Sequence, residues 1–88
     1  MKVLFRESFA RDLRRIEDQD VQRRIQRAVE SVEQAESLLD IPHLRRLRAK
    51  GRYHRIRVGD YRLGLTVDGD KVCFVRALHR REIYRYFP

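Results

Sequence analysis

The chain has 88 residues, a single cysteine and a formal net charge of +8, with an isoelectric point near 10.5. This length predicts one domain over residues 1–88 with a small core. A lone cysteine excludes an internal disulfide, and no apolar run reaches the roughly 18 residues of a membrane span. The N-terminus lacks the apolar run of a signal peptide, so we expect a cytoplasmic protein that does not enter a membrane.

The first 40 residues predict one strand and two helices. Lys2–Arg6 is a short apolar run typical of a strand. Glu7–Ile16 places apolar residues three and four positions apart, as in an amphipathic helix, and Ser8 is expected to cap it. Asp20 is expected to cap a second amphipathic helix that ends near residue 38 or 39. Together these helices predict a hairpin whose apolar stripe needs a sheet to cover it.

The rest of the chain predicts a sheet. Leu44–Arg48 is either a short edge strand or a connecting segment. Three strands follow, separated by turn residues and ended by a short tail: Tyr53–Val58, Tyr61–Val67 and Lys71–Leu78. The element order is therefore β-α-α-β-β-β. It predicts an α+β fold in which a helical hairpin packs on a mainly antiparallel, twisted sheet.

The strand Tyr53–Val58 has two chemically different faces. Ile56 and Val58 alternate with Arg55 and Arg57, and successive side chains of a strand point to opposite faces. We expect the apolar face to pack on the helices. The face with the arginines is then available to solvent or to a ligand.

The positive charge is concentrated in the second half of the chain. Residues 1–40 hold eight Lys/Arg and nine Asp/Glu, a net charge of −1, whereas residues 41–88 hold thirteen and four, a net charge of +9. Most of these cations are arginines, which bind phosphate with two parallel hydrogen bonds and stack on bases. The pattern indicates a polyanionic partner. An arginine-biased proteome would explain the excess of arginine, but not its uneven distribution.

Two motifs of the chain, RIRVGDYR at Arg55–Arg62 and LHRREIY at Leu78–Tyr84, resemble the RelE/ParE toxin superfamily, and in particular its RelE-like branch of type II toxin–antitoxin systems. The resemblance covers almost the whole chain. It implies a ribosome-dependent mRNA endonuclease that inhibits translation by metal-independent cleavage in the A site, with no cofactor. It also implies three partners: the ribosome, mRNA and a cognate antitoxin protein encoded nearby.

Two other functions stay open at this point. ParE members of the superfamily share the fold but inhibit DNA gyrase. An attenuated, noncatalytic member would bind RNA or an antitoxin without cleaving.

The resemblance also implies which side chains would act on RNA. The expected catalytic residues are Arg55, Arg57, Arg62, Arg80, Tyr84 and His79. Arg62 would clamp the scissile phosphate, and Arg80, or alternatively Arg81, would stabilise the charge that develops on it. Tyr84 would stack on a base or take part in proton transfer. Further RNA contacts are expected from a basic run and from the tail: Arg45, Arg46, Arg48, Lys50, Arg52 and Arg81. A solvated loop is an equally open interpretation of the basic run.

The general base is the open part of this site. The best-known RelE toxin has lysines where this chain has Arg55 and Arg57, and an arginine is not deprotonated in proteins. His79 is the preferred candidate because imidazole titrates near neutral pH; Tyr84, His54 and Glu82 are the alternatives. The three histidines are scattered and have no partner cysteines, so no metal site is predicted. Purely structural roles stay open too. Arg62 could pair with nearby acidic side chains, and Cys73 is most simply a small buried apolar residue.

Overall fold

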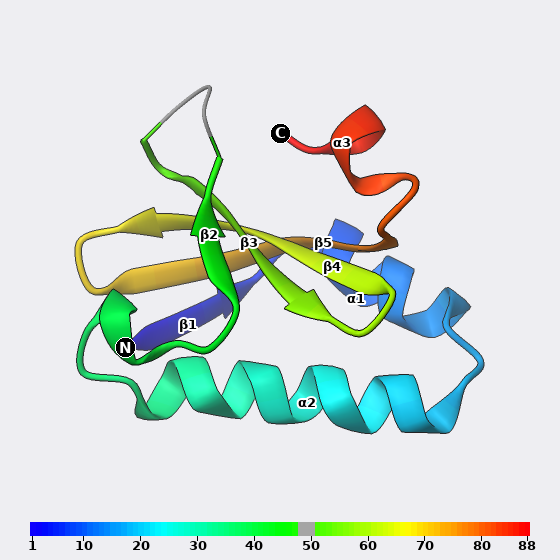
Figure 1. Cartoon of the computed structure of the whole chain (residues 1–88), viewed down its shortest axis with the longest axis horizontal. Coiled ribbons are helices and arrows are strands. Elements are labelled where there is room, and N and C mark those ends of the chain that lie inside the picture. The colour runs from blue at the N-terminus through cyan, green and yellow to red at the C-terminus, as the bar shows by residue number, and fades with distance from the viewer. Residues whose placement is uncertain (48–50) are drawn as a thin grey trace.

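The computed structural model describes residues 1–47 and 51–88 (Figure 1). Its elements are, in chain order, β1 (Lys2–Phe5), α1 (Glu7–Arg15), α2 (Gln19–Gln34), the 3-10 helix η1 (Leu38–Asp40), β2 (Leu44–Arg46), β3 (Tyr53–Val58), β4 (Tyr61–Asp68), β5 (Lys71–His79) and α3 (Ile83–Tyr86). The predicted α+β fold is confirmed. The tail differs from the prediction because it contains the short helix α3.

One five-stranded sheet organises the molecule, in the order β1-β5-β4-β3-β2. β1 runs parallel to β5, and every other neighbouring pair is antiparallel. The segment left open by the sequence is an edge strand, since Leu44–Arg46 pairs with β3. In Figure 1, α2 lies along one face of the sheet, and α3 lies on the other side near the ends of β4 and β5.

The two faces of β3 are as different as the sequence predicts. Ile56 and Val58 are buried in the core against the helices, together with residues of β4 and β5. His54 shares this face and is only 6% exposed. Arg55 and Arg57 lie on the opposite face, where Arg57 is exposed. That face is therefore available for a ligand.

Helix α1 covers the edge of β5 where β1 no longer pairs with it. The Ser8 hydroxyl donates to the Val75 carbonyl, and the Asp12 carboxylate accepts from the Ala77 N–H at 3.0 Å. Asp12 also pairs with Arg76, whose Nε lies 2.8 Å from Oδ2. These side chains satisfy a strand edge that would otherwise be unpaired. The prediction that Ser8 caps α1 is wrong, because its hydroxyl is bonded to the strand.

The start of α2 also differs from the prediction. Asp18, and not Asp20, caps the helix: its Oδ1 accepts from the backbone N–H groups of Asp20 and Val21 at 2.9 and 3.3 Å. Both residue types suit a helix start. Asp18 occupies the capping position because the loop after α1 is only residues 16–18, which brings the helix start forward.

Helix α2 ends earlier than the apolar pattern predicts. Its last residue is Gln34, because Ala35 adopts an extended conformation. The backbone nitrogen of Met1 donates to the carbonyl oxygens of Glu33 and Ala35 at 3.0 and 2.9 Å, which satisfies groups at the helix end. The apolar residues that follow belong to the separate turn of η1. The predicted end near residue 38 or 39 is therefore wrong.

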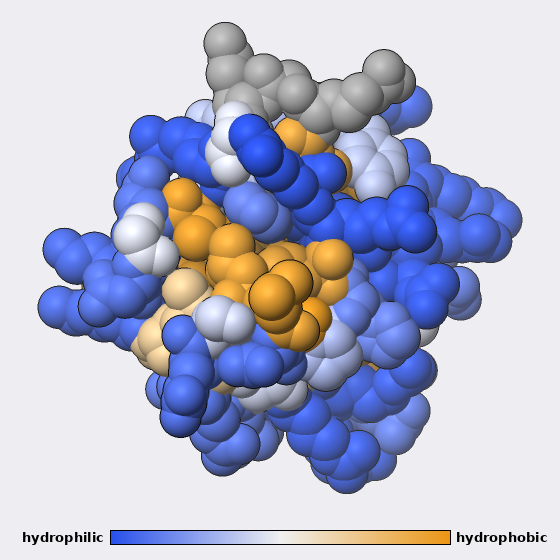
Figure 2. All heavy atoms as spheres, turned by 60° about the vertical axis from the view of Figure 1, so that its left-hand side comes forward, coloured by the Kyte–Doolittle hydropathy of each residue, from blue (hydrophilic) through white to orange (hydrophobic). Residues whose placement is uncertain are grey.

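Figure 2 shows the side of the molecule where η1 lies as mainly hydrophilic, with an apolar patch at its centre. Leu39 of η1 is 97% exposed.

Cys73 is half-buried, so its expected burial is only partial. Within the described residues, no helix has the length and apolar character needed to cross a membrane.

Candidate functional site

Four arginines form a row across the face of the sheet opposite α2. Arg45 of β2 lies directly opposite Arg55 of β3, and Arg57 of β3 lies directly opposite Arg62 of β4. Directly opposed residues share a face with their Cβ atoms about 4.5–5.5 Å apart, and like charges there repel. The sheet therefore holds positive charges together at a cost in stability that a bound anion would offset.

Two adjoining hollows lie along this row. The first, of about 450 Å³, is lined by Arg55, Arg62, Arg80, Arg81 and Tyr84. The second, of about 490 Å³, is lined by Arg24, His43, Arg57, Gly59, Asp60, Arg62 and Arg80. The fold thus brings together all four arginines expected to be catalytic, along with the expected tyrosine. Of the residues expected to be catalytic, His79 alone lines neither hollow.

The tight turn between β3 and β4 positions two of these arginines. Arg62 Nη1 donates to the carbonyl oxygens of Gly59 and Tyr61 at 2.8 and 2.9 Å. The backbone N–H of Arg80 donates to the Asp60 carbonyl at 2.7 Å, and its Nε lies 3.7 Å from the Asp60 carboxylate. Gly59 has a φ of +59°, which glycine adopts without strain. The turn therefore orients the Arg62 guanidinium and holds the backbone of Arg80 beside it.

The electrostatics at Arg62 favour an anion. Burial lowers the pKa of Arg62 below its ordinary value, and the neighbouring charge of Arg55 lowers it further. Arg57 and Arg80 act in the same direction, while Tyr84 acts against them. A phosphate between these groups would offset the repulsion between the arginines and favour the charged form of the Arg62 guanidinium.

His43 joins the site, although the sequence did not suggest it. Arg57 Nη2 lies 3.3 Å from His43 Nδ1, and Arg55 Nη1 donates to the His43 carbonyl at 3.1 Å. His43 has a φ of 60°, an uncommon conformation for a residue other than glycine. In the sequence, the one indication of a special role for His43 was its position directly after Pro42 and before the edge strand. Without the register of that strand, nothing indicated that it reaches Arg57.

The other candidates for proton transfer lie elsewhere. The His79 ring packs edge-to-face on Tyr61 at 5.7 Å, and its Nδ1 accepts from the Arg81 N–H at 3.2 Å. His54 is buried in the core. Glu82 is exposed and precedes α3 without lining either hollow. Within the described residues, no three His, Cys, Asp or Glu side chains are grouped as metal ligands.

The residues expected to make further RNA contacts are divided. Arg81 lines the first hollow, and Arg45 lines a smaller one of about 190 Å³ beside Arg55 and Arg57. Arg46 and Arg52 line none of these hollows, and Arg52 instead lies 3.5 Å from the carboxylate of Asp68. Arg48 and Lys50 are outside the described residues.

Helix α3 presents Tyr84 to the first hollow. Ile83 is fully buried, and Phe87 is 3% exposed and packs edge-to-face on Tyr53 at 5.6 Å. A Cβ atom at Gly64 of β4 would lie only 2.7 Å from the Phe87 ring. The absence of a side chain at Gly64 thus lets the tail lie flat on the sheet. Tyr84, which lies between these anchors, remains 61% exposed.

Replacing Gly64 by alanine is expected to destabilise the protein by about 1–3 kcal/mol, because the added methyl group overlaps the buried Phe87 ring. Urea denaturation measures this change. The cost of Gly64→Ala should be smaller in a Phe87→Leu background, where the ring is absent. An equal cost in both backgrounds would contradict the proposed overlap.

Comparison with known proteins connects this geometry to a family. The sequence model of the family described as "ParE toxin of type II toxin-antitoxin system, parDE" matches residues 3–84. The chain belongs to this toxin family. It is also 40% identical to Toxin RelE3 of Methanocaldococcus jannaschii over 89 aligned residues, which cover the full length of both proteins.

The similarity to RelE toxins extends to a solved structure. One is the RelB–RelE antitoxin–toxin complex from Methanococcus jannaschii: 36% identity, 97% of this chain and 99% of the other covered, and a TM-score of 0.81. The YoeB dimer from Staphylococcus aureus shares the fold, at 18% identity with 90% and 95% covered and a TM-score of 0.72. The chain is thus a RelE-like toxin of a type II toxin–antitoxin system, as its motifs indicate.

Proposed function

We propose that this toxin is a ribosome-dependent endoribonuclease that cleaves mRNA in the A site of cytoplasmic ribosomes, without a metal ion or cofactor. The observation that carries the proposal is the convergence of Arg55, Arg57, Arg62 and Arg80 on two joined hollows beside an exposed tyrosine. Clustered guanidinium groups bind a phosphodiester and stabilise the extra negative charge of its transition state.

Each part of the reaction has a candidate side chain. The 2′-oxygen attacks the adjacent phosphorus, the bond to the 5′-oxygen breaks, and a 2′,3′-cyclic phosphate forms. Arg62 holds the phosphate, and Arg80 stabilises the developing charge. Tyr84 offers its ring to a base and its hydroxyl as a proton source for the departing 5′-oxygen.

His43 is the proposed base for the 2′-hydroxyl. Arg57 can only donate, so a hydrogen bond between the two side chains requires Nδ1 of His43 to accept through its lone pair. A phosphate that draws Arg57 away would leave Nδ1 free to take the 2′-hydroxyl proton. His43 therefore replaces His79 as the preferred base, since His79 faces Tyr61.

Replacing His43 by asparagine is expected to slow cleavage by about 10²- to 10⁴-fold, the usual contribution of general acid–base catalysis. Asparagine also tolerates a positive φ, so the backbone should be undisturbed. Single-turnover cleavage on ribosomes measures the change, with His79→Asn as the matched control. A larger loss with His79→Asn would return the role of base to His79.

The surface also suits an antitoxin, and we include one, encoded nearby, in the proposal. A groove of about 630 Å³ between α1 and α2 is lined mainly by apolar side chains, among them Phe5, Phe9, Leu13 and Val29. Such a groove fits the apolar face of an amphipathic segment. An acidic segment of the antitoxin would neutralise the arginine row of the toxin. A similar protein is seen in an antitoxin–toxin complex, which supports this partner.

Primer extension on an mRNA in a translating extract tests the enzymatic proposal. Purified toxin should produce cuts that require ribosomes, since the ribosome orients the RNA for attack. Intact mRNA would overturn the proposal. A gyrase supercoiling assay would then separate a gyrase inhibitor from a noncatalytic binding protein.

A further inference from the structure

A further hollow, beside those of the arginine row, lies between α2 and the start of β2. It has a volume of about 300 Å³, within the range of small ligand sites, and its lining is more apolar than polar. Its floor contains the buried side chains of Ile41, Ile56 and Val58. Its rim carries the guanidinium groups of Arg24 and Arg27 of α2. An apolar floor with a cationic rim matches a nucleotide, because the flat face of its base stacks on apolar surface and its phosphate is anionic.

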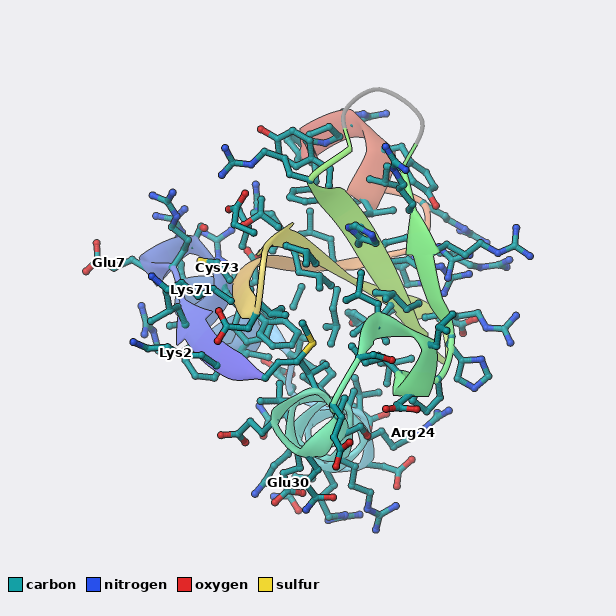
Figure 3. All side chains as sticks on the ribbon, turned by 90° about the vertical axis from the view of Figure 1, so that its left-hand side faces the viewer. Lys2, Glu7, Arg24, Glu30, Lys71 and Cys73 are labelled. Carbon is teal, nitrogen blue, oxygen red and sulfur yellow. The ribbon has the colours of Figure 1, made fainter. Side chains whose placement is uncertain are left out.

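This hollow is continuous with the proposed cleavage site. Arg24, His43 and Arg57 line both this hollow and the second hollow of the arginine row. The Arg24 side chain reaches the β3–β4 turn, where its Nη1 would lie 2.8 Å from a Cβ atom at Gly59. Figure 3 shows Arg24 on the side of the molecule where β2 lies, far from Lys2 and Lys71.

The charges on the rim are not neutralised by neighbours. Arg24 and Arg27 lie three residues apart on the same helix face, where like charges repel. Both are exposed, and neither forms an ion pair with any described residue. Arg23, on the same turn, is instead 3.6 Å from Asp20 and does not line the hollow.

We propose that this hollow binds the nucleotide next to the cleaved phosphodiester on the same single RNA strand. The base lies on the apolar floor, and the phosphate lies between Arg24 and Arg27. His43 and Arg57, at the shared border, separate this nucleotide from the bond that breaks. The inference rests on the proposed endonuclease function and adds to it a subsite on α2.

Binding of short RNAs tests this subsite directly. The probes are fluorescent 2′-O-methyl oligonucleotides of two and four nucleotides, whose blocked 2′-oxygens prevent cleavage. Fluorescence anisotropy should show tighter binding of the tetranucleotide to the wild-type toxin. The gain is the ratio of the affinity for the tetranucleotide to the affinity for the dinucleotide. In the Arg24→Ala/Arg27→Ala variant this ratio should fall at least about tenfold. The slope of log affinity against log salt should become shallower by about 0.7 for each lost phosphate contact.

The controls separate a subsite from a general loss of charge. Arg23→Ala removes an exposed arginine from the same turn and should keep the gain. Ala28→Phe fills the hollow without changing charge and should remove it; circular dichroism checks that this variant folds. An unchanged gain in the double variant would overturn the inference. So would an equal loss of affinity for an RNA duplex, because a duplex backbone cannot place a base in the hollow.

The subsite and the enzymatic function can fail separately. Cleavage on ribosomes without any length-dependent binding would overturn the subsite alone. Length-dependent binding that needs Arg24 and Arg27, in a toxin that does not cleave mRNA, would overturn the endonuclease and leave the nucleotide site in place.

Discussion

Arg62→Ala is expected to reduce single-turnover cleavage of ribosome-bound mRNA by about 10²- to 10³-fold, the usual effect of removing one preorganised donor to a transition-state oxyanion. Arg62 and Arg80 both line the two hollows of the row. The β3–β4 turn fixes the direction of the Arg62 side chain through two carbonyl groups. Its loss would leave the phosphate with one cation fewer at the centre of the site.

Two further variants make this result interpretable. Arg62→Lys keeps the charge but loses the planar fork, so it should recover only part of the activity. Arg23→Ala lowers the net charge equally, away from the hollows, and should cleave like the wild type. Thermal unfolding shows whether the lost carbonyl contacts loosen the turn. Wild-type cleavage by a folded Arg62→Ala protein would remove Arg62 from the catalytic site.

Asp12→Ala is expected to destabilise the fold by about 3 kcal/mol, because the partly buried Arg76 guanidinium and the buried Ala77 N–H both lose their acceptor. The Asp12 side chain is 2% exposed, and its two oxygens accept from Arg76 and from the Ala77 backbone. The Asp12 hydrogen bond raises the pKa of Arg76. Without the carboxylate, a charge and a backbone donor at the edge of β5 lose their partner.

The midpoint of urea denaturation measures this loss. Asp20→Ala is the matched control, because the Asp20 carboxylate pairs with Arg23 at the surface and should contribute at most about 1 kcal/mol. Asp12→Asn keeps an acceptor for the Ala77 N–H and should be less harmful than Asp12→Ala. Equal, small effects of Asp12→Ala and Asp20→Ala would show that the Asp12–Arg76 pair adds little to stability.

The sequence by itself determined the two long helices, the central strands and the faces of β3, because these depend on local spacing; it missed the short helices η1 and α3. The period-two alternation of Arg55 and Arg57 with Ile56 and Val58 predicted the arginine-bearing face of β3, and the glycine-containing turns predicted the hairpins. The site arginines were identified through the motifs that resemble RelE-like toxins. Local spacing was less reliable at the ends of α2, where Asp18 and Asp20 both suit a cap and chain contacts decide the last turn.

Only the tertiary structure decided which distant side chains meet. Asp12 and Arg76 are 64 residues apart, and His43 and Arg57 are 14 apart, yet each pair is in contact. Gly64 and Phe87 pack together because α3 folds back on the sheet. Arg24 lines two of the hollows, although its sequence context predicts only a solvated face of an amphipathic helix. Strand register and helix docking are set by many weak packing contacts acting together, and no short stretch of sequence contains them.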